Sequence, residues 1–325
     1  MLLNKTVVIR TEASSKIGFG HLGRCLALNE SISKEANVIF FTSSEAVLEK
    51  CKRLNLNYLY CSCDIEGIEQ LKSENPNLII NSFLIDKKEH YSKELVAKLQ
   101  NKCQKVFFIE NNSIGTLLAD GVIYPAAHFD YKTVYSNCKF KMPSNKIIHG
   151  IEYVLIRDIF KSQKCSNGGG IVVTTGASDP NKVMYKIDEK LASLKLKAHF
   201  LLGEGFNYKL GYFGKKFGST YSKYSPTHIA KSDIIISTFG VSVYEAIFLS
   251  KPIISIGHNE ENSVGSSILA KNINQVLDLG FFKDINVENL SRLIKDCYEL
   301  KKSTLDRVID GKGALRITKL ILQDD

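Results

Sequence analysis

Three short segments of the chain combine small residues with polar side chains that could carry chemistry. The first, Ser14–Arg24, places Gly18, Gly20 and Gly23 around His21, at the start of a stretch with helical spacing. Glycines let the backbone approach a ligand closely, and a helix start offers N–H groups to an anion or a sugar hydroxyl. An imidazole titrates near neutrality, so His21 is suited to act as a general base. The alternative interpretation is a histidine that caps the helix or packs beneath the loop.

The glycines of this segment also fit the Gly-x-Gly-x-x-Gly pattern of dinucleotide-binding folds. In those folds the first glycine lies in a tight turn directly after a strand, whereas here the stretch Thr11–Ile17 precedes Gly18. The next apolar run ends at Phe40–Ser44 without the carboxylate that would hold a ribose. The context therefore disfavours a nicotinamide or flavin site.

The second segment, Thr174–Asn181, is predicted to be a strand-to-helix turn. Small residues such as Gly176 and Ser178 leave room for a ligand at the end of the strand. Asp179 is followed by Pro180, which favours helix capping over catalysis as the role of this aspartate.

The third segment, Ser237–Glu245, is predicted to turn from a strand into a helix near Val241. Backbone amides at Gly240, Val241 and Ser242 would form a seat for a diphosphate. Glu245, one turn into the helix, could accept hydrogen bonds from both hydroxyls of a ribose. The alternative is a glutamate that only complements the helix dipole.

These segments lie among apolar runs that alternate with helical patterns. Strands are predicted at 7–10, 38–42, 58–61, 78–81 and 106–109, and again at 171–175, 198–202, 234–237 and 253–256. Helices are predicted at 21–34, 44–54, 65–74, 88–102, 181–193, 241–250, 262–271, 287–300 and 312–323. Such alternation indicates parallel sheets with right-handed crossovers.

The length of 325 residues suits two domains. We predict an α/β fold of the GT-B type, with two doubly wound, Rossmann-like sheets facing a shared cleft. The first domain would span 1–163 and bind a sugar. The second, 164–325, would bind the nucleotide, with its last helix packing back on the first.

Composition excludes several classes of protein. The chain is 44% hydrophobic and 24% charged, as in ordinary globular proteins, and we expect no membrane insertion. Its start, Met1–Lys5, leads at once into a strand-like run, so we expect a cytoplasmic protein without a signal peptide. The net charge of +9 comes from scattered lysines, which disfavours nucleic-acid binding. Eight cysteines show no metal-ligand spacing. The sequence has no Walker A, Asp-x-Asp, His-Glu-x-x-His or Gly-x-Ser-x-Gly motif, so neither metal nor cofactor is expected.

Four motifs resemble one family. They are Ile17–Arg24, Gly150–Phe160, Thr175–Pro180 and Asp310–Arg316, and they occur in the family's order. The chain resembles the UDP-sugar hydrolases of pseudaminic acid biosynthesis, which are grouped with SpsG-type spore-coat proteins and are similar in fold to MurG-type GT-B glycosyltransferases.

This resemblance implies a metal-independent hydrolase. The substrate would be UDP-2,4-diacetamido-2,4,6-trideoxy-β-L-altropyranose or a related nucleotide-sugar, attacked by water at C1 with inversion. The resemblance implies that His21 is the base, with Gly18, Gly20, Arg24, Asn81, Phe83, Gly176 and Ser178 near the sugar, and Gly240, Val241, Ser242, Glu245, Glu261 and Asn262 at the nucleotide.

The chain departs from the family at three places. After the predicted fourth strand, Asn81-Ser82-Phe83 replaces an Asp-x-Tyr motif; after the fifth, Glu110-Asn111-Asn112 replaces paired aspartates; near the uracil, Glu261-Asn262-Ser263 replaces Glu-Asn-Gln. Polar pockets discriminate strongly between substrates, so such changes affect the predicted sugar more than the predicted nucleotide. Two alternatives stay open: a GT-B glycosyltransferase acting on a hydroxyl acceptor, and a non-catalytic partner of a sugar cytidylyltransferase.

Overall fold

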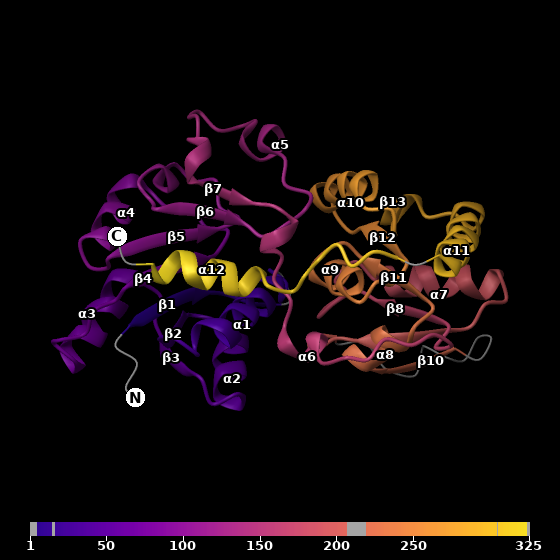
Figure 1. Cartoon of the computed structure of the whole chain (residues 1–325), viewed down its shortest axis with the longest axis horizontal. Coiled ribbons are helices and arrows are strands. Elements are labelled where there is room, and N and C mark those ends of the chain that lie inside the picture. The colour runs from indigo at the N-terminus through magenta and orange to yellow at the C-terminus, as the bar shows by residue number, and fades with distance from the viewer. Residues whose placement is uncertain (1–4, 15–16, 207–218, 304, 324–325) are drawn as a thin grey trace. The chain divides into compact units, whose positions relative to one another are not determined.

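The computed structural model describes residues 5–14, 17–206, 219–303 and 305–323, so the predicted start at residues 1–4 lies outside them. The chain forms two compact α/β units (Figure 1). The first unit falls within Met1–Ile17, His21–Arg157 and Gly311–Asp325, and the second comprises Gly18–Gly20 and Asp158–Asp310.

The first unit is built on a parallel sheet of seven strands. In chain order these are β1 (Thr6–Thr11), β2 (Asn37–Thr42), β3 (Asn57–Tyr60), β4 (Ser82–Asp86), β5 (Lys105–Ile109), β6 (Gly121–Tyr124) and β7 (Ile147–His149), and across the sheet they run β3-β2-β1-β4-β5-β6-β7. The helices of this unit are α1 (Gly20–Ile32), α2 (Glu45–Arg53), α3 (Asp64–Glu74), α4 (Lys93–Gln100), α5 (Tyr131–Tyr135) and α12 (Gly313–Leu322), with short 3-10 turns at Ile114–Leu117, Ser144–Lys146 and Ile151–Tyr153.

Strand β1 lies in the interior of this sheet, and its sequence shows why the sheet is buried on both faces. All six of its residues are buried, so both faces of the sheet are covered, as the continuous apolar run Val7–Ile9 predicts. Arg10 is the only charged residue of β1, and it has no exposed surface. Its guanidinium forms ion pairs with Glu12 at 2.9 Å and Asp64 at 3.0 Å, which offset the cost of burying its charge.

The second unit contains a parallel sheet of six strands. These are β8 (Ile171–Thr174), β9 (Ala198–Leu202), β10 (Thr220–Lys223), β11 (Ile234–Thr238), β12 (Ile253–Gly257) and β13 (Val276–Phe281), in the order β10-β9-β8-β11-β12-β13. The helices are α6 (Asp158–Lys161), α7 (Val183–Ser193), α8 (Pro226–Lys231), α9 (Val241–Phe248), α10 (Glu260–Asn272) and α11 (Val287–Lys302), with a 3-10 turn at Phe282–Asp284.

Both sheets reverse their strand order beside the first strand. In the first unit the reversal lies between β1 and β4, which pair in parallel from Val7–Ser82 to Thr11–Asp86. In the second it lies between β8 and β11, paired from Ile171–Ile234 to Thr174–Ser237. Ligands of such sheets bind at the carboxyl ends of the strands at this reversal.

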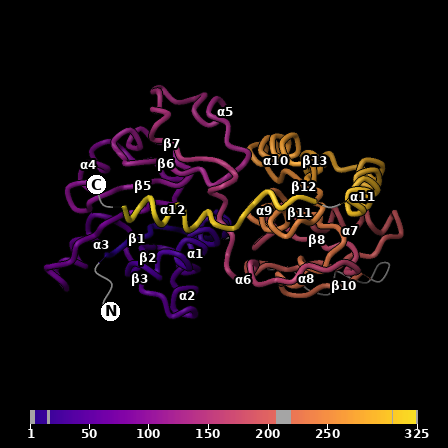
Figure 2. The backbone as a smooth tube through the Cα atoms, viewed as in Figure 1, coloured from indigo at the N-terminus to yellow at the C-terminus, as the bar shows by residue number. Residues whose placement is uncertain are grey.

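The last helix, α12, belongs to the first unit rather than to the second (Figure 2). Lys5 Nζ donates to the carbonyl of Leu322 at 2.7 Å, and Thr318 Oγ1 donates to Ser31 Oγ at 2.9 Å. A Cβ atom at Gly313 would lie 2.2 Å from the carbonyl oxygen of Val154, so only glycine allows this approach.

Most predicted strands and helices are present, but the fourth strand was misplaced. Residues 78–81 precede β4, and the strand itself begins at Ser82. The four strands β6, β7, β10 and β13 were not predicted. Three of these have only three or four residues, which is too short for a clear pattern.

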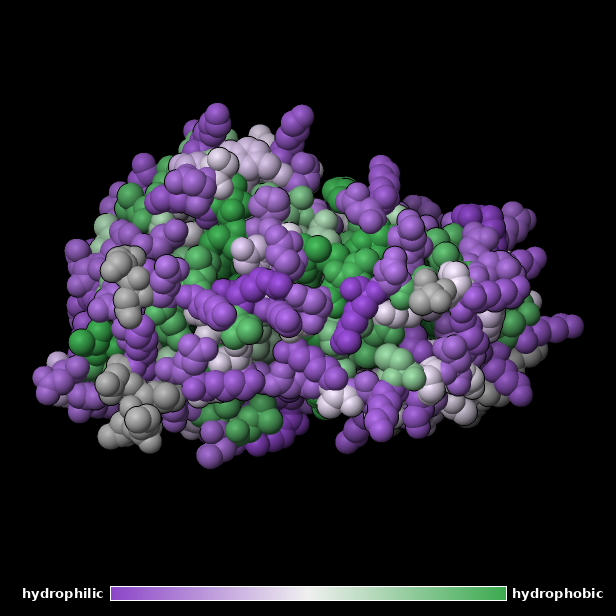
Figure 3. Space-filling model, in the orientation of Figure 1, coloured by the Kyte–Doolittle hydropathy of each residue, from purple (hydrophilic) through white to green (hydrophobic). Residues whose placement is uncertain are grey.

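The surface matches an ordinary globular chain. On the face shown in Figure 3, hydrophilic residues are interspersed with apolar ones. None of the helices in the described part of the chain has the length and apolar character needed to cross a bilayer. All eight cysteines are free thiols.

Candidate functional site

A buried carboxylate lies at the strand reversal of the first unit. Asp86 is the last residue of β4 and has no exposed surface. His21, the second residue of α1, directs its Nδ1 at Asp86 Oδ1 over 2.5 Å and is itself 7% exposed. The histidine is therefore oriented by a carboxylate, the arrangement that fixes the imidazole of many catalytic sites.

Arg24 joins this pair from the same face of α1. It follows His21 by three residues, close to one helical turn, so both side chains reach Asp86. Arg24 Nε donates to Asp86 Oδ2 at 2.6 Å and Nη2 donates to Oδ1 at 2.8 Å, a bidentate pair. Cys25, on the same face, lies 3.4 Å from Asp86 Oδ2 through its Sγ.

The charges around Asp86 set its protonation state. Burial alone would raise the pKa of Asp86, but the charge and hydrogen bonds of Arg24, with the hydrogen bond of His21, hold that pKa well below its ordinary value. Burial also raises the pKa of the Cys25 thiol, and the Asp86 charge adds to this effect. Asp86 is thus an anion at neutral pH, and the raised pKa keeps Cys25 a thiol there.

These contacts select one tautomer of His21. Ionised Asp86 can only accept hydrogen bonds, so the proton of the neutral imidazole is placed on Nδ1. Arg24 Nη2, 3.0 Å from the same Nδ1, has no acceptor capacity and instead bonds Asp86. Nε2 then carries the lone pair, which is the form needed to take a proton from water.

Glu110 completes this network, which we call the His21 cluster (His21, Arg24, Asp86 and Glu110). Its carboxylate pairs with Arg24 Nη1. Glu110 follows β5 with a φ of 48°, a left-handed conformation that costs energy for a residue with a side chain. The next residue, Asn111, holds the turn by donating to the carbonyls of Lys87 at 2.9 Å and Glu89 at 3.0 Å.

The reversal point of the second unit is lined by small residues instead. Gly176, after β8, has a φ of 76°, which favours glycine, and a Cβ there would lie 3.8 Å from Ser242 Oγ. The N-cap of α9 is Gly240, which has no side chain, so no N-cap side chain bonds the first amides of this helix. The structure thus brings Gly176 together with Ser242, while Ser178 is half-buried farther along the β8–α7 turn.

Glu245 lies one turn along α9 and is buried, with 7% exposed surface. The hydroxyl of Tyr224 donates a hydrogen bond to Glu245 Oε2. Tyr224 directly follows β10, so this contact joins the edge strand to α9. The Glu245 carboxylate is therefore held in place by a side chain from outside α9.

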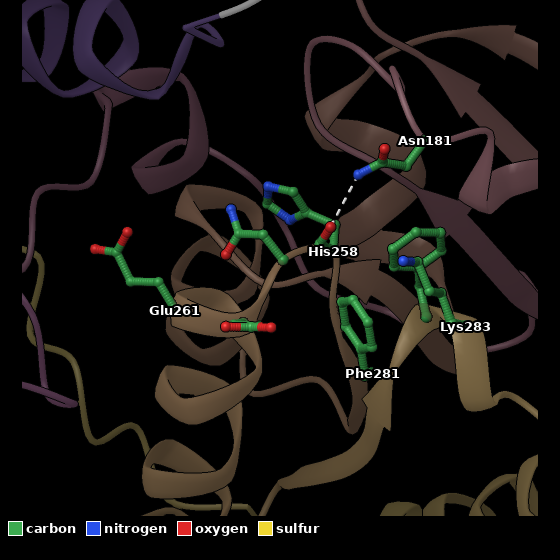
Figure 4. Close-up of a pocket in the computed structure, with 8 residues that line it drawn as sticks. Asn181, His258, Glu261, Phe281 and Lys283 are labelled. Atoms are coloured by element: carbon green, nitrogen blue, oxygen red, sulfur yellow. Dashed lines mark hydrogen bonds between the residues drawn. The ribbon is translucent and has the colours of Figure 1, made fainter.

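Glu261 and Asn262 lie in the first turn of α10, beside a shallow pocket of about 480 Å³ (Figure 4). The amide of Asn262 donates to Asn259 Oδ1 at 2.8 Å, so this end of the helix is capped. Asn181 Nδ2 donates to the carbonyl of His258 at 2.8 Å across the pocket, and Glu261 is exposed at its rim. Phe281 and Lys283 lie on the opposite side in Figure 4, and Phe282 also lines the pocket.

Two predicted sugar ligands lie away from the His21 cluster. Asn81 precedes β4, where its Oδ1 accepts from the amide of Thr6 at 2.9 Å and its Nδ2 donates to Gln104 at 2.8 Å. Phe83 has no exposed surface and packs in the apolar core of the first unit. Both stand at the amino-terminal side of β4, so the expectation that they face a sugar is wrong.

The sequence analysis found no carboxylate at the end of the fourth strand, but the structure has Asp86 there. The prediction ended the fourth strand at Asn81, five residues too early, and so compared the wrong triplet with the family motif. Strand β4 ends at Asp86, which Lys87 and Lys88 follow, so a carboxylate does lie at the carboxyl end of this strand. The run Phe83–Ile85 ending in an aspartate was the signal that could have revealed it.

Asp179 accepts from the first amides of α7, as expected of a capping residue, but it is not the N-cap: α7 begins at Val183 after Lys182, so Pro180 precedes the helix. Its two carboxylate oxygens accept from the amides of Val183 and Met184, each at 2.9 Å. Within the described residues, no group of three or more His, Cys, Asp or Glu side chains is arranged to hold a metal ion.

Two curated proteins are similar to the chain along much of its length, while no family model matches it. Protein MJ1062 of Methanocaldococcus jannaschii is 26% identical over 283 residues, which cover 78% of this chain and 56% of that protein, so the chain spans about half of its length. The spore coat polysaccharide biosynthesis protein SpsG of Bacillus subtilis is 24% identical over 339 residues, covering 94% of each. The chain is thus distantly related to SpsG.

Solved structures show the same fold. The glycosyltransferase of kitacinnamycin superposes with a TM-score of 0.65 at 12% identity, covering 97% of this chain and 98% of that one. MurG of Acinetobacter baumannii gives 0.61 at 11%, covering 98% and 99%. UGT89C1 of Arabidopsis thaliana complexed with UDP gives 0.57 at 10%, covering 98% and 100%. The predicted GT-B fold is confirmed.

Proposed function

We propose that this protein is a metal-independent hydrolase that removes UDP from a nucleotide-sugar, with His21 as the general base. The observation that carries the proposal is the buried His21–Asp86 pair at a strand reversal, the place where ligands of such sheets bind. Asp86 orients the imidazole, and Arg24 keeps Asp86 ionised. His21 is then prepared to receive a proton without rearrangement.

The proposed reaction is an inverting displacement at the anomeric carbon. Water oxygen forms a bond to C1 while the bond from C1 to the phosphate oxygen breaks, and UDP leaves with the electron pair. The proton lost by water goes to Nε2 of His21. The imidazolium is stabilised by the Asp86 carboxylate, 2.5 Å from Nδ1, and the products are UDP and the free sugar with inverted configuration.

The nucleotide is assigned to the second unit. The N-terminal amides of α9 at Val241 and Ser242, with Gly176 and Gly240 leaving the approach open, suit a diphosphate. Glu245 suits the ribose hydroxyls because its carboxylate is buried and fixed by Tyr224. A structural relative complexed with UDP supports a nucleotide in this fold.

The sugar is proposed to be the diacetamido-trideoxyhexose of pseudaminic acid synthesis, or another surface-glycan precursor. The distant similarity to SpsG, whose name refers to polysaccharide biosynthesis, supports that class. Asp86 supplies the carboxylate of the family's Asp-x-Tyr motif, whereas Lys88 stands in place of its phenol. A lysine would contact a different set of sugar groups, so related sugars belong in the test.

A second candidate is a glycosyltransferase, in which a hydroxyl acceptor replaces water. It is favoured by the names of the structural relatives, which include a glycosyltransferase and MurG. Chemistry at His21 would be the same, because either nucleophile must lose a proton. The two candidates differ only in whether UDP release needs an acceptor.

The deciding experiment measures UDP release from UDP-2,4-diacetamido-2,4,6-trideoxy-β-L-altropyranose without acceptor. We expect turnover by the wild type and loss of about a thousandfold or more in His21→Ala. His90→Ala, a change at an exposed histidine, is the matched control and should keep full activity. Full turnover in His21→Ala would overturn the mechanism. Release that requires an added hydroxyl acceptor would establish the transferase instead.

A further inference from the structure

We infer that Glu110 is the counter-charge that prepares His21 to accept a proton. This role rests on the proposed function, in which His21 is the base, and it belongs to a carboxylate that the family resemblance leaves unassigned. The observation behind it is that Glu110 pairs with Nη1 of Arg24, while Asp86 binds Nε and Nη2 of the same guanidinium. Glu110 acts on His21 through Arg24 and through its charge, so it is a positioning residue.

The His21 cluster holds more negative than positive charge. The single guanidinium of Arg24 is shared between the carboxylates of Asp86 and Glu110. With a neutral imidazole the cluster is therefore a net anion, and it becomes neutral when His21 takes a proton. Without Glu110, the same proton would turn a neutral cluster into a cation. Burial disfavours net charge, so Glu110 makes proton transfer to His21 easier.

The backbone at Glu110 indicates that this position provides a carboxylate rather than a turn. Its φ of 48° would suit glycine without strain, and a side chain there raises the energy. The turn is held by other contacts: the amide of Glu110 donates to the carbonyl of Ile123 at 3.0 Å, and buried Asn111 donates to two carbonyls after β4. The fold thus directs a carboxylate at Arg24 from a backbone conformation that would cost less without a side chain.

The surroundings keep Glu110 ionised. Burial alone would raise the pKa of its carboxyl, and the charge of Asp86 acts in the same direction. The charge of Arg24 outweighs both, with a smaller contribution from His128 after β6, and holds the pKa of Glu110 below its ordinary value. Glu110 is therefore an anion at the pH where an imidazole titrates.

The other ionisable groups around His21 leave this balance unchanged. Cys25, on the same helix, stays a neutral thiol because burial raises its pKa. Lys87, after β4, pairs with Glu89 at 2.6 Å and lies 3.9 Å from Glu12, so its charge is matched by carboxylates outside the cluster. The anion in excess near His21 is thus Glu110.

The test is the pH titration of the His21 imidazole, followed by NMR of isotope-labelled histidine in the protein without substrate. The signal of His21 is assigned by its absence from His21→Ala. Glu110→Gln keeps an oxygen that can accept from Arg24 and removes only the charge. We expect the midpoint of the titration to fall by about one pH unit in this variant, the effect of one charge in a partly buried site.

Three further variants separate charge from structure. Glu110→Gly also removes the charge, but it relieves the backbone strain, so it provides the same comparison if Glu110→Gln folds poorly. Glu110→Asp keeps the charge, and aspartate tolerates a left-handed backbone better than glutamate, so it should restore most of the difference. Glu299→Gln, at an exposed ion pair with Lys302, is the matched control and should titrate as the wild type.

With substrate present, the same charge should affect the pH dependence of UDP release. In Glu110→Gln the acidic limb of kcat/KM should move to lower pH by the amount measured by NMR, because this limb reports the base in the free enzyme. The plateau above it should fall by about three- to tenfold, since a weaker base accepts the proton less readily.

The outcomes separate this inference from the proposed function. An unmoved titration in both Glu110→Gln and Glu110→Gly overturns the role of Glu110, because a merely structural residue would leave the imidazole unchanged. A midpoint that falls as far in Glu110→Asp or in Glu299→Gln also overturns it, since the charge at this position is then not the cause. If the titrations shift as expected but the wild type releases no UDP, the proposed function is contradicted and the charge balance of the His21 cluster stands.

Discussion

The ends of β1 and β4 in the first unit and those of β8 and β11 in the second occupy the same topological position, yet their chemistry differs. The first is filled with polar and charged side chains, with Asp86 paired to both His21 and Arg24. The second presents glycines and helix amides, with Ser242 beside Gly176. Side chains with fixed charge suit proton transfer, whereas backbone amides suit an anion that arrives with its own charge. On the proposed function, the same sheet order would serve two different tasks.

The largest effect is expected when the His21 cluster loses its anion. Asp86→Asn replaces the carboxylate with an amide whose NH2 can donate to Nδ1 and so favour the other tautomer, and UDP release should fall by about a thousandfold or more. UDP binding should stay within about twofold, because the diphosphate seat belongs to the other sheet. Steady-state kinetics and calorimetry measure the two quantities. The control is Asp296→Asn, at an exposed ion pair with Arg292. Loss of UDP affinity equal to the loss of rate would break the proposed separation of tasks.

A smaller effect is expected from Arg24→Lys. A lysine keeps the charge but cannot make the two parallel hydrogen bonds to Asp86, at 2.6 and 2.8 Å. We expect kcat to decrease by about 10–100-fold with little change in KM, since geometry rather than charge is lost. Arg292→Lys, at an exposed surface pair, is the matched control. A variant with wild-type kcat would show that the charge alone is sufficient.

In the second unit, Gly176→Ala should weaken UDP binding by about tenfold. The substitution adds a methyl group next to Ser242 and strains a backbone with φ of 76°. Gly168→Ala is the control, because Gly168 also has a positive φ, of 101°, with open space around it. Both variants should lose similar stability, but only Gly176→Ala should lose UDP affinity in calorimetry. Equal UDP affinities would remove Gly176 from the diphosphate seat.

The smallest effect concerns acid stability of the first unit. The pKa of Asp86 is lower in the folded chain than its ordinary value near 4, so its ionisation stabilises the fold fully above that pH. This contribution is lost as the pH falls from about 4 toward the folded-state pKa, by about 1.4 kcal/mol per pH unit. The difference in unfolding midpoint between wild type and Asp86→Asn should therefore shrink below about pH 4. A difference that is constant from pH 6 to pH 3 would contradict the depressed pKa.

The sequence was sufficient for the fold because its signals were long and periodic. Short apolar runs such as Val7–Arg10 and Ile234–Ser237 are typical of strands buried on both faces, and they alternate with helical patterns. His21 was found because glycines and a helix start marked its loop. Asp86 was missed because the apolar pair Ile79–Ile80 was taken as the strand, although these residues precede it.

Partners that meet only through tertiary structure could not be predicted. Arg24 and Glu110 are separated by 86 positions, and nothing in either local pattern indicates that they pair. The same holds for Tyr224, which follows a four-residue edge strand without a clear pattern. The three-residue spacing of His21 and Arg24 places both on one helix face, but the group that faces them is identified only by the sheet register.

The placement of α12 has a consequence for dissecting the protein. Because Gly311–Asp325 belongs with the first unit, nearly all of the second unit, Asp158–Asp310, is an uninterrupted insertion within the first. A fragment ending at residue 163 would lack the helix that receives the hydrogen bond of Lys5 and donates one to Ser31. A truncation after residue 163 therefore damages the first unit. Deletion of residues 158–310, with a short linker joining residues 157 and 311, would instead remove nearly all of the second unit and leave the first with its last helix.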